Sequence, residues 1–254
     1  MTVQWMFDRA DEIVVSIHQL VDNLYPPRMP PDRPRVGLFL TIAEQFEAAL
    51  HLAKAGAGSH SAVHVRSMLE ALATMNMLGI HPNYVDQIRY TQLKGQKKFF
   101  ADLLSNHDLP DPDRASLEAQ LAACTQDFNV LHARGLRPKQ ITQTFSDAGL
   151  AHFVSAYTML CGFSHNDLSV LAMRHQGDEG MVYMAPIAPQ VLQGIFFWGI
   201  FTVVVAAKPL QTLATFPDGL FEQAFQAINN SWGAFLTQAG ADPAQVALTL
   251  GTHQ

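Results

Sequence analysis

Two opposite charges stand one helical turn apart in a segment whose other residues are mostly apolar. In the stretch SAVHVRSMLEALA, residues 61–73, Arg66 and Glu70 occupy positions i and i+4, which places them on one face of a helix. One interpretation is an internal ion pair that ties neighbouring helices together. The other is a polar centre that serves function, with His64 and Ser67 close by. A buried ion pair adds little stability because both ions lose their hydration, so its presence is informative.

A second group of polar residues lies in YTMLCGFSHNDLSVL, which begins at Tyr157. Tyr157, Cys161 and Ser164 recur at about helical spacing and therefore share a face, and His165 and Asn166 follow where this helix ends. A helix C-terminus favours a protonated imidazole, and an unperturbed pKa of about 6.5 suits a general acid or base. The alternative interpretation of His165 is a capping or core histidine.

Motifs for metals, phosphate loops and nucleophiles are missing from the sequence. Eleven histidines prompt a search for metal ligands, but no Glu-x-x-His, His-Glu-x-x-His or Cys-x-x-Cys spacing occurs. No Gly-rich phosphate loop and no Gly-x-Ser-x-Gly elbow is present either. We therefore expect neither a metal nor a cofactor.

The composition is that of a folded globular protein with few charges. Of 254 residues, 48% are hydrophobic and only 15% are charged, so much of the chain must be buried or covered by a partner. The net charge of −6 excludes a global basic field for nucleic acid. Two cysteines suit a reducing compartment, and the N-terminal residues do not resemble a signal peptide, so we expect a cytoplasmic protein.

One local basic segment makes RNA a candidate partner. The stretch HARGLRPK contains His132, Arg134, Arg137 and Lys139, and lysines at 94–98 lie in the helix expected before it. These side chains could contact phosphates, although such a run is more often a solvated face. No interleaved aromatic residues suggest stacking on bases, and no DNA-reading motif is present.

The elements that must position these residues are helices nearly throughout, because apolar residues recur at helical spacing. We predict one all-α domain over residues 1–254, a bundle of about seven to nine helices. It comprises an N-terminal helix (1–25), a Pro-rich linker (26–34), a core bundle (35–213) and C-terminal helices (218–250). The GDEG turn predicts one small β-hairpin near 172–185.

Within the core bundle, turn residues divide the chain into separate helices. Ser59 or Ser61 is expected to cap the helix that carries Arg66 and Glu70. The expected helices cover residues 35–55, 60–78, 83–106, 112–132, 138–146, 149–163 and 188–213.

The run GIFFWGIFTVVVAA, residues 194–207, contains no charge. A membrane span needs about twenty such residues, so we interpret this run as a buried central helix rather than a membrane segment. A helix at a dimer interface is a variant of this interpretation. We therefore expect a homo-oligomer that associates through the 194–207 helix.

The two helical motifs together resemble a widespread bacterial all-helical family that is known only as a domain of unknown function, over roughly residues 35–210. Its members show Arg-Ser-x-x-Glu and, later, Tyr-x-x-Leu-Ser-x-x-Val-His. Arg66, Ser67 and Glu70 match the first motif. Tyr157, Leu160 and His165 match the second, with Cys161 and Ser164 in place of the serine and the valine. The resemblance implies that Arg66, Glu70 and His165 come together in the bundle.

That family is in turn distantly similar to the HEPN-type helical bundles, many of which are metal-independent ribonucleases of toxin–antitoxin and phage-defence systems. Their motif is Arg followed after four to six residues by His, a spacing that this chain lacks.

Two functions remain open. One is a binding or regulatory bundle in which Arg66, Glu70 and His165 line a polar pocket. Further binding candidates in that pocket are His64, Tyr157, Cys161, Ser164 and Asn166. The alternative is an endoribonuclease in which His165 is the acid and base, Arg66 stabilises the pentavalent phosphate and Glu70 orients Arg66.

Overall fold

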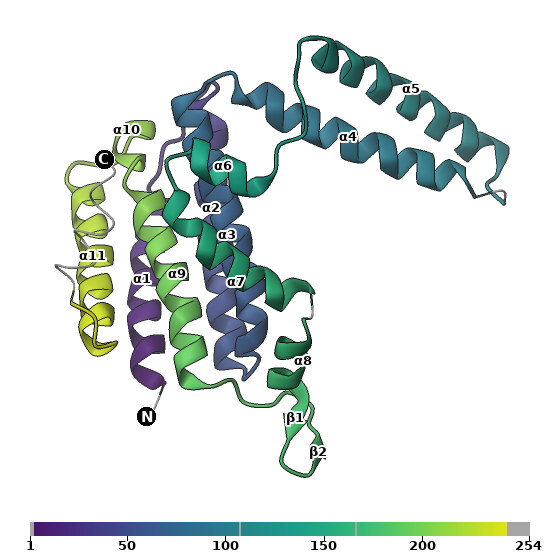
Figure 1. Cartoon of the computed structure of the whole chain (residues 1–254). Helices are drawn as coiled ribbons and strands as arrows, with labels where there is room; N and C mark the ends of the chain where they lie inside the picture. Colours follow the sequence, from purple (N-terminus) through teal and green to yellow (C-terminus); the bar gives the residue numbers. More distant parts are fainter. Residues whose placement is uncertain (1–2, 107, 166, 243–254) are drawn as a thin grey trace.

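The computed structural model describes residues 3–106, 108–165 and 167–242, which form a helical bundle with one short two-stranded hairpin (Figure 1). The predicted all-α class with a small hairpin is therefore confirmed. The long helices of the bundle are α1 (Gln4–Asp22), α2 (Asp32–Lys54), α3 (Gly58–Ile80), α7 (Val154–His165), α9 (Pro189–Ala207) and α11 (Leu220–Gln238). Shorter helical segments are α6 (Ile141–Asp147), a 3-10 turn (Ala151–Phe153), α8 (Leu168–His175) and α10 (Leu210–Leu213).

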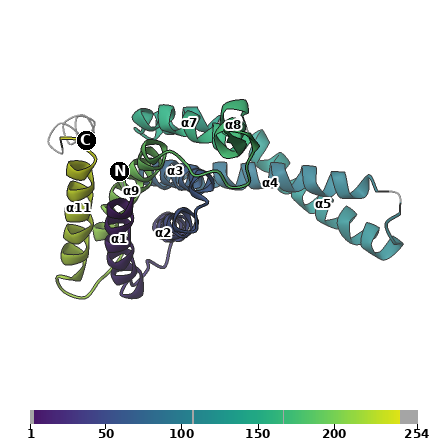
Figure 2. The ribbon, with the colours of Figure 1, turned by 90° about the horizontal axis from the view of Figure 1, so that it is seen from below.

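The apolar helix α9 lies in the middle of the bundle. It packs against α1, α2, α3 and α11, so the chain itself covers most of its sides (Figures 1 and 2). Phe196, Ile200 and Val203 are almost fully buried in this contact. A helix that is apolar all round is expected in such a position, because every face then loses contact with water.

Two helices are long and apolar enough to cross a membrane by length and composition alone. They span Asp32–Lys54 and Pro189–Leu213, and 44% and 56% of their most apolar windows are buried inside the fold. The core helices of soluble proteins have the same properties, so length and composition do not distinguish the two cases.

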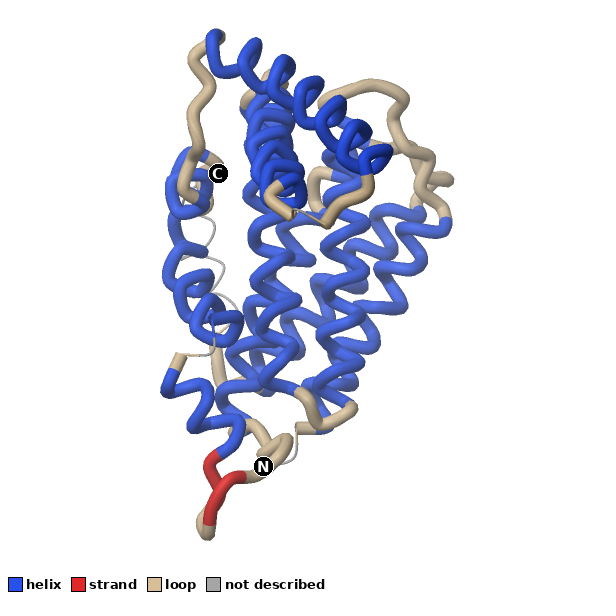
Figure 3. Tube along the Cα trace, turned by 90° about the vertical axis from the view of Figure 1, so that its right-hand side faces the viewer, coloured by secondary structure: helices blue, strands red, loops and turns tan. Residues whose placement is uncertain are grey.

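Helices α4 (Tyr84–Leu104) and α5 (Asp111–Ala133) form an antiparallel pair that projects from the bundle; we call this pair the arm (Figures 1 and 3). Its small core contains Tyr90, Leu93 and Leu131 and is separate from the core of the bundle. Lys97 and Phe128 add a cation–π contact of 4.3 Å between the ammonium group and the ring centroid.

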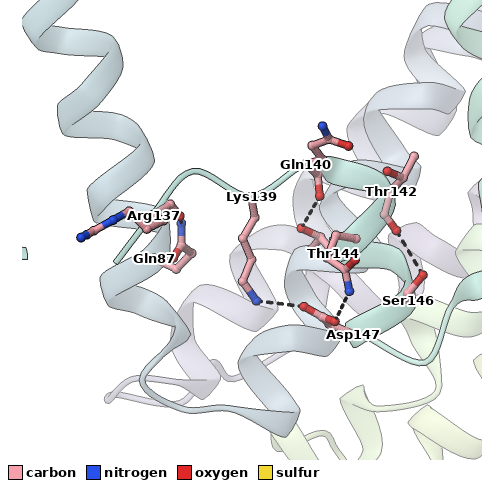
Figure 4. A network of polar contacts seen from close by, with 9 residues as sticks. Gln87, Arg137, Lys139, Gln140, Thr142, Thr144, Ser146 and Asp147 are labelled. Atoms are coloured by element: carbon pink, nitrogen blue, oxygen red, sulfur yellow. Dashed lines mark hydrogen bonds and ion pairs between the residues drawn. The ribbon is translucent and has the colours of Figure 1, made fainter. Parts of the chain in front are cut away.

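Polar bonds tie the base of the arm to the segment that follows it. Gln87 of α4 donates a hydrogen bond to the carbonyl oxygen of Arg137 at 3.0 Å, and Lys139 pairs with Asp147 of α6 at 2.9 Å (Figure 4). The hydrogen bond from Lys139 lowers the pKa of the Asp147 carboxyl group, with Gln143 as the next cause. The arm therefore leaves the bundle from an anchored base.

The predicted hairpin is confirmed inside the expected range. Strands β1 (Gln176–Gly177) and β2 (Gly180–Met181) pair antiparallel, with Gln176 opposite Met181. Gly177 needs to be a glycine, because a Cβ atom there would lie 2.4 Å from a methyl group of Val182.

Some boundaries differ from the prediction. The linker ends earlier than expected, since α2 begins at Asp32 and includes Pro34. Proline is tolerated in a first helical turn because the amide that it lacks would have no partner there. Neither Ser59 nor Ser61 caps α3, and the Ser61 hydroxyl donates instead to the carbonyl oxygen of Ala49 at 2.6 Å. Of the C-terminal helices predicted over 218–250, α11 is described, whereas residues 243–250 lie outside the described residues.

Candidate functional site

The opposite charges of α3 meet a tyrosine from α7. The Arg66 guanidinium donates to the Tyr157 hydroxyl at 3.0 Å, and this hydroxyl donates to Glu70 Oε1 at 2.9 Å. Arg66 Nη2 and Glu70 Oε1 are themselves 3.0 Å apart, and the guanidinium carbon lies 5.2 Å from the centroid of the tyrosine ring. We call Arg66, Glu70 and Tyr157 the clamp, because their bonds join α3 to α7.

The clamp stabilises the charged arginine and the neutral phenol. Burial, together with the hydrogen bond to Glu70 and the charge of that carboxylate, raises the pKa of Tyr157 to about 12, against the opposing bond from Arg66. Burial opposes the charge of Arg66, but the bond to Tyr157 and the nearby Glu70 raise its pKa overall. Neither group is therefore prepared to exchange a proton near neutral pH.

The Arg66–Glu70 pair is not the internal ion pair of the first interpretation, because α3 is not buried on every side. The side chains of Arg66 and Glu70 retain 25% and 41% of their exposure, so the ion pair lies at the edge of the α3–α7 contact rather than inside the core. Val63, one turn before Arg66, is also exposed. Both charged side chains are therefore in partial contact with water, which removes most of the desolvation cost of an internal pair.

His165 lies at a distance from the clamp. It is an exposed residue in the last turn of α7, eight residues beyond Tyr157, which corresponds to about 12 Å along a helix axis. The nearby Phe163 accepts a hydrogen bond from Arg174, which also contacts Ser59 at the start of α3. In the part of the chain that the structure describes, Arg66 and Glu70 form their side-chain bonds with Tyr157 and with each other, not with His165.

The other predicted site residues do not all lie beside the clamp. His64 points toward α2, where its Nδ1 atom lies 2.7 Å from Gln45 Oε1, and burial lowers its pKa. Cys161 is partly buried beside the clamp, close enough for its thiol to raise the pKa of Arg66. The Ser164 hydroxyl is buried and has no hydrogen-bond partner among the described residues. Asn166 lies outside the described residues.

A cavity that sequence reasoning missed lies at the N-terminal end of α3. It measures about 180 Å³, and α8 and the residues after β2 form its other walls. The polar residues that line it are Ser59, His60, Arg174, His175 and Tyr183. We call it the α3–α8 cavity.

Arg174 is the most deeply buried charge of this cavity, with 6% of the residue exposed. Its Nε atom donates to the Ser59 hydroxyl at 3.1 Å, and its Nη2 atom donates to the carbonyl oxygens of Ser59 and Phe163 at 3.2 and 3.1 Å. Burial lowers the pKa of Arg174. These three bonds to oxygen atoms hold the guanidinium group in place at the wall of the cavity.

Two histidines stand beside this arginine. Burial, followed by repulsion from Arg174 and His175, lowers the pKa of His60. The Nδ1 atom of His175 lies 3.2 Å from the carbonyl oxygen of Val182, so in the neutral ring Nδ1 donates this bond and Nε2 remains an acceptor. Neither aspartate nor glutamate occurs among the described residues that line the cavity. Among the described residues of the lining, Arg174 thus carries a positive charge, and an imidazole that takes up a proton adds another.

Periodicity could not have revealed this cavity, because His60 and the Arg174–His175 pair are more than a hundred residues apart in the chain. The available signal was weak: a histidine in a Gly-rich turn, and adjacent Arg and His residues before a hairpin. Only the packing of α8 against the start of α3 unites them.

The basic segment around residues 132–139 has partners within the chain. Arg134 pairs with Asp86 at 2.6 Å, and Lys139 pairs with Asp147. Arg137 donates to the carbonyl oxygens of His132 and Leu136. These bonds satisfy side chains that the sequence offered as phosphate contacts, so RNA binding through this segment stays a prediction without support from its geometry.

A search of the described residues finds no group of three or more His, Cys, Asp or Glu side chains placed to hold a metal ion. Comparison with known proteins gives one match: residues 32–182 match a family that is described as a family of unknown function (DUF5677). No curated protein and no solved structure matches the chain. The matched range contains the clamp, His60, Arg174 and His175.

Proposed function

Since the chain belongs to this family of unknown function, DUF5677, we propose from the geometry of the α3–α8 cavity that the protein is a binding module for a small anion. The observation that carries the proposal is the lining of the cavity, where one buried arginine and two histidines stand together and the described lining residues include no carboxylate. Such a set of fixed donors favours an anion, because each contact is a charge-assisted hydrogen bond once the imidazoles are protonated.

The size of the cavity limits the ligand. Sites for drug-sized molecules measure about 300–1,000 Å³. A cavity of about 180 Å³ instead suits a small oxyanion or the anionic end of a larger molecule. Tyr183, an exposed aromatic residue at its edge, could cover the apolar part of such a ligand.

The clamp has a positioning role in this proposal. It fixes α7 on α3, and Phe163 near the end of α7 supplies one of the carbonyl oxygens that hold Arg174. Arg66, Glu70 and Tyr157 thus support the cavity from a distance: Phe163 lies about two helical turns beyond Tyr157, and Ser59 about two turns before Arg66. Direct ligand contacts by Arg66, Glu70 and His165 stay predictions.

Sulfate is a suitable probe because its charge is constant across the pH range in which histidine titrates. Sulfate should raise the melting temperature more than chloride at equal ionic strength, since a ligand that binds only the folded state stabilises it. The pKa of His60 lies below its usual value in the free protein, and a bound anion raises it. Binding therefore takes up a proton, and sulfate affinity should fall as the pH rises from about 5 to 8.

His60→Ala should weaken sulfate binding by about tenfold, which corresponds to the loss of one charge-assisted hydrogen bond. His18→Ala is the matched control, because His18 is exposed on α1 and pairs with Glu47 instead. Titration calorimetry with both variants measures the difference. Equal affinities for the two variants, or a sulfate effect no larger than that of chloride, would refute the proposal.

A metal-independent endoribonuclease is the second candidate. The observation in its favour is the group of His60, His175 and Arg174 around one cavity, since RNA cleavage without a metal needs an acid, a base and a cation. Labelled RNA should be incubated with the wild type, His165→Ala and His60→Ala. Loss of cleavage in one variant assigns that histidine, whereas equal cleavage in all three, or none, excludes the nuclease.

A further inference from the structure

The outer part of the arm buries none of its own residues. From Lys94 to Val130, apart from residue 107, every described residue is exposed or only partly buried. Helices of this length are marginal in water unless a face is packed, because most helical stability in proteins comes from tertiary contacts. Apart from the contact between α4 and α5, this part of the arm therefore leaves helix faces open to a partner.

The face of α4 that points away from α5 has the pattern of a contact surface. Tyr90 and Leu93 occupy the inner face toward α5. A second stripe follows the same helix at positions i, i+4, i+7, i+11 and i+15. Its members are Ile88, Gln92, Gly95, Phe99 and Leu103. Three of these are large apolar residues that keep more than a third of their surface exposed: Phe99 is 57% exposed, Leu103 38% and Ile88 36%.

Charge is excluded from this stripe, although the helix is rich in it. The lysines of this helix lie between the stripe positions and occupy none of them; they are Lys94, Lys97 and Lys98. Charged residues are common on a helix face that is exposed to solvent, whereas they are depleted at the centre of a protein–protein interface.

Gly95 stands in the middle of the stripe and in the interior of the helix. A glycine there costs about 1 kcal/mol of helix stability relative to alanine. Nothing in the fold requires it, because a Cβ atom at this position would meet no atom within 4 Å. A glycine at the centre of a helix face allows the backbone of another helix to approach closely.

The stripe is complementary to itself. If two α4 helices cross antiparallel about a twofold axis near the peptide between Gly95 and Gln96, Ile88 of one copy reaches the level of Leu103 of the other. Phe99 then reaches the level of Gln92, and the two Gly95 residues lie next to the axis. Each layer joins uncharged groups, and each pairing occurs twice, once from each copy, as in an isologous contact of identical surfaces.

We propose that the occupant of this face is a second copy of the chain, held by an antiparallel contact between the two α4 helices. This replaces α9 as the expected interface, because α9 is packed against four helices of its own chain. The interface is independent of the α3–α8 cavity and would stand if the anion proposal failed.

Analytical ultracentrifugation of the full chain tests the contact. The wild type should sediment with twice the mass of one chain, and Phe99→Glu should raise the dimer dissociation constant at least about tenfold. Gly95→Leu should do the same through steric exclusion, although it favours the helix and meets open space in the monomer. A loss of association in this variant cannot result from unfolding, which circular dichroism should verify.

Lys94→Leu is the matched control, because it places the same side chain one residue away and off the stripe. It should remain dimeric. In addition, Gly95→Cys should form a disulfide between copies under mild oxidation, whereas Lys94→Cys should not. A monomeric wild type at every concentration would overturn the proposal and leave the stripe to a different protein. A dimer that persists in both Phe99→Glu and Gly95→Leu would overturn it as well.

Discussion

The Tyr157 hydroxyl is the central group of the clamp, because it accepts a hydrogen bond from Arg66 and donates one to Glu70. The arginine and the glutamate are one helical turn apart and would meet in an isolated helix. The tyrosine turns this local pair into a connection between two helices. Its pKa of about 12 means that the phenol keeps its proton, and therefore its donor, throughout the physiological range.

Tyr157→Phe should lower the free energy of unfolding by about 1–3 kcal/mol, because it removes two hydrogen bonds to charged groups that remain partly buried. Urea denaturation measures this loss. The control is Tyr25→Phe, since Tyr25 is 66% exposed and its hydroxyl is free to bond with water. Equal effects of the two substitutions would mean that the clamp contributes nothing. Absorbance titration should also show one fewer tyrosine ionising near pH 12 in Tyr157→Phe.

Among the helices, α9 packs against several neighbours at once, and its two glycines differ in what they contact. Gly199 faces α2 and α3, where a Cβ atom would lie 3.3 Å from a methyl group of Val65 and 3.5 Å from the ring of Phe46. Gly194 is on the same helix, and a Cβ atom there would meet no atom within 4 Å. The same residue type thus has a packing role at one position and none at the other.

The two glycines of α9 should respond to substitution with opposite signs. Gly194→Ala should raise the free energy of unfolding by up to about 1 kcal/mol, because alanine favours the helix and the space is open. Gly199→Val should lower it by about 1–3 kcal/mol, because the added methyl groups overpack the contact with Val65 and Phe46. Thermal and urea unfolding of both variants measure the signs. A stabilised Gly199→Val protein would show that α9 can move away from α3.

At the scale of the whole molecule, the chain combines a densely packed bundle with an arm that has little core of its own (Figure 1). Local stability in proteins follows the density of buried apolar contacts, so the two parts should open with different free energies. The cavity lies at the end of α3 where the bundle meets α8, and the arm leaves from the opposite end of α3. The two proposals therefore place ligand binding and self-association at separate ends of the same helix.

Hydrogen exchange should separate these two parts. Amides of the outer arm should exchange by local opening in dilute protein, whereas those of α9 should exchange only through global unfolding. At concentrations that favour a dimer, the amides of α4 should become more protected, while those of α6 serve as a reference that stays unchanged. Uniform protection of arm and bundle in dilute protein would contradict this account.

Local sequence patterns predicted the helices, the small hairpin, the central position of the 194–207 run and the shared helix face of Arg66 and Glu70. Each of these depends on local spacing: apolar residues at helical period, a GDEG turn, or two charges one turn apart. The positions of Tyr157 between Arg66 and Glu70, of His165 beyond them and of His60 near Arg174 became evident in the folded chain. These contacts join residues that are distant in the chain, and their geometry depends on how α7 and α8 pack on α3. Periodicity gives the face of a helix, but packing decides which neighbour that face meets.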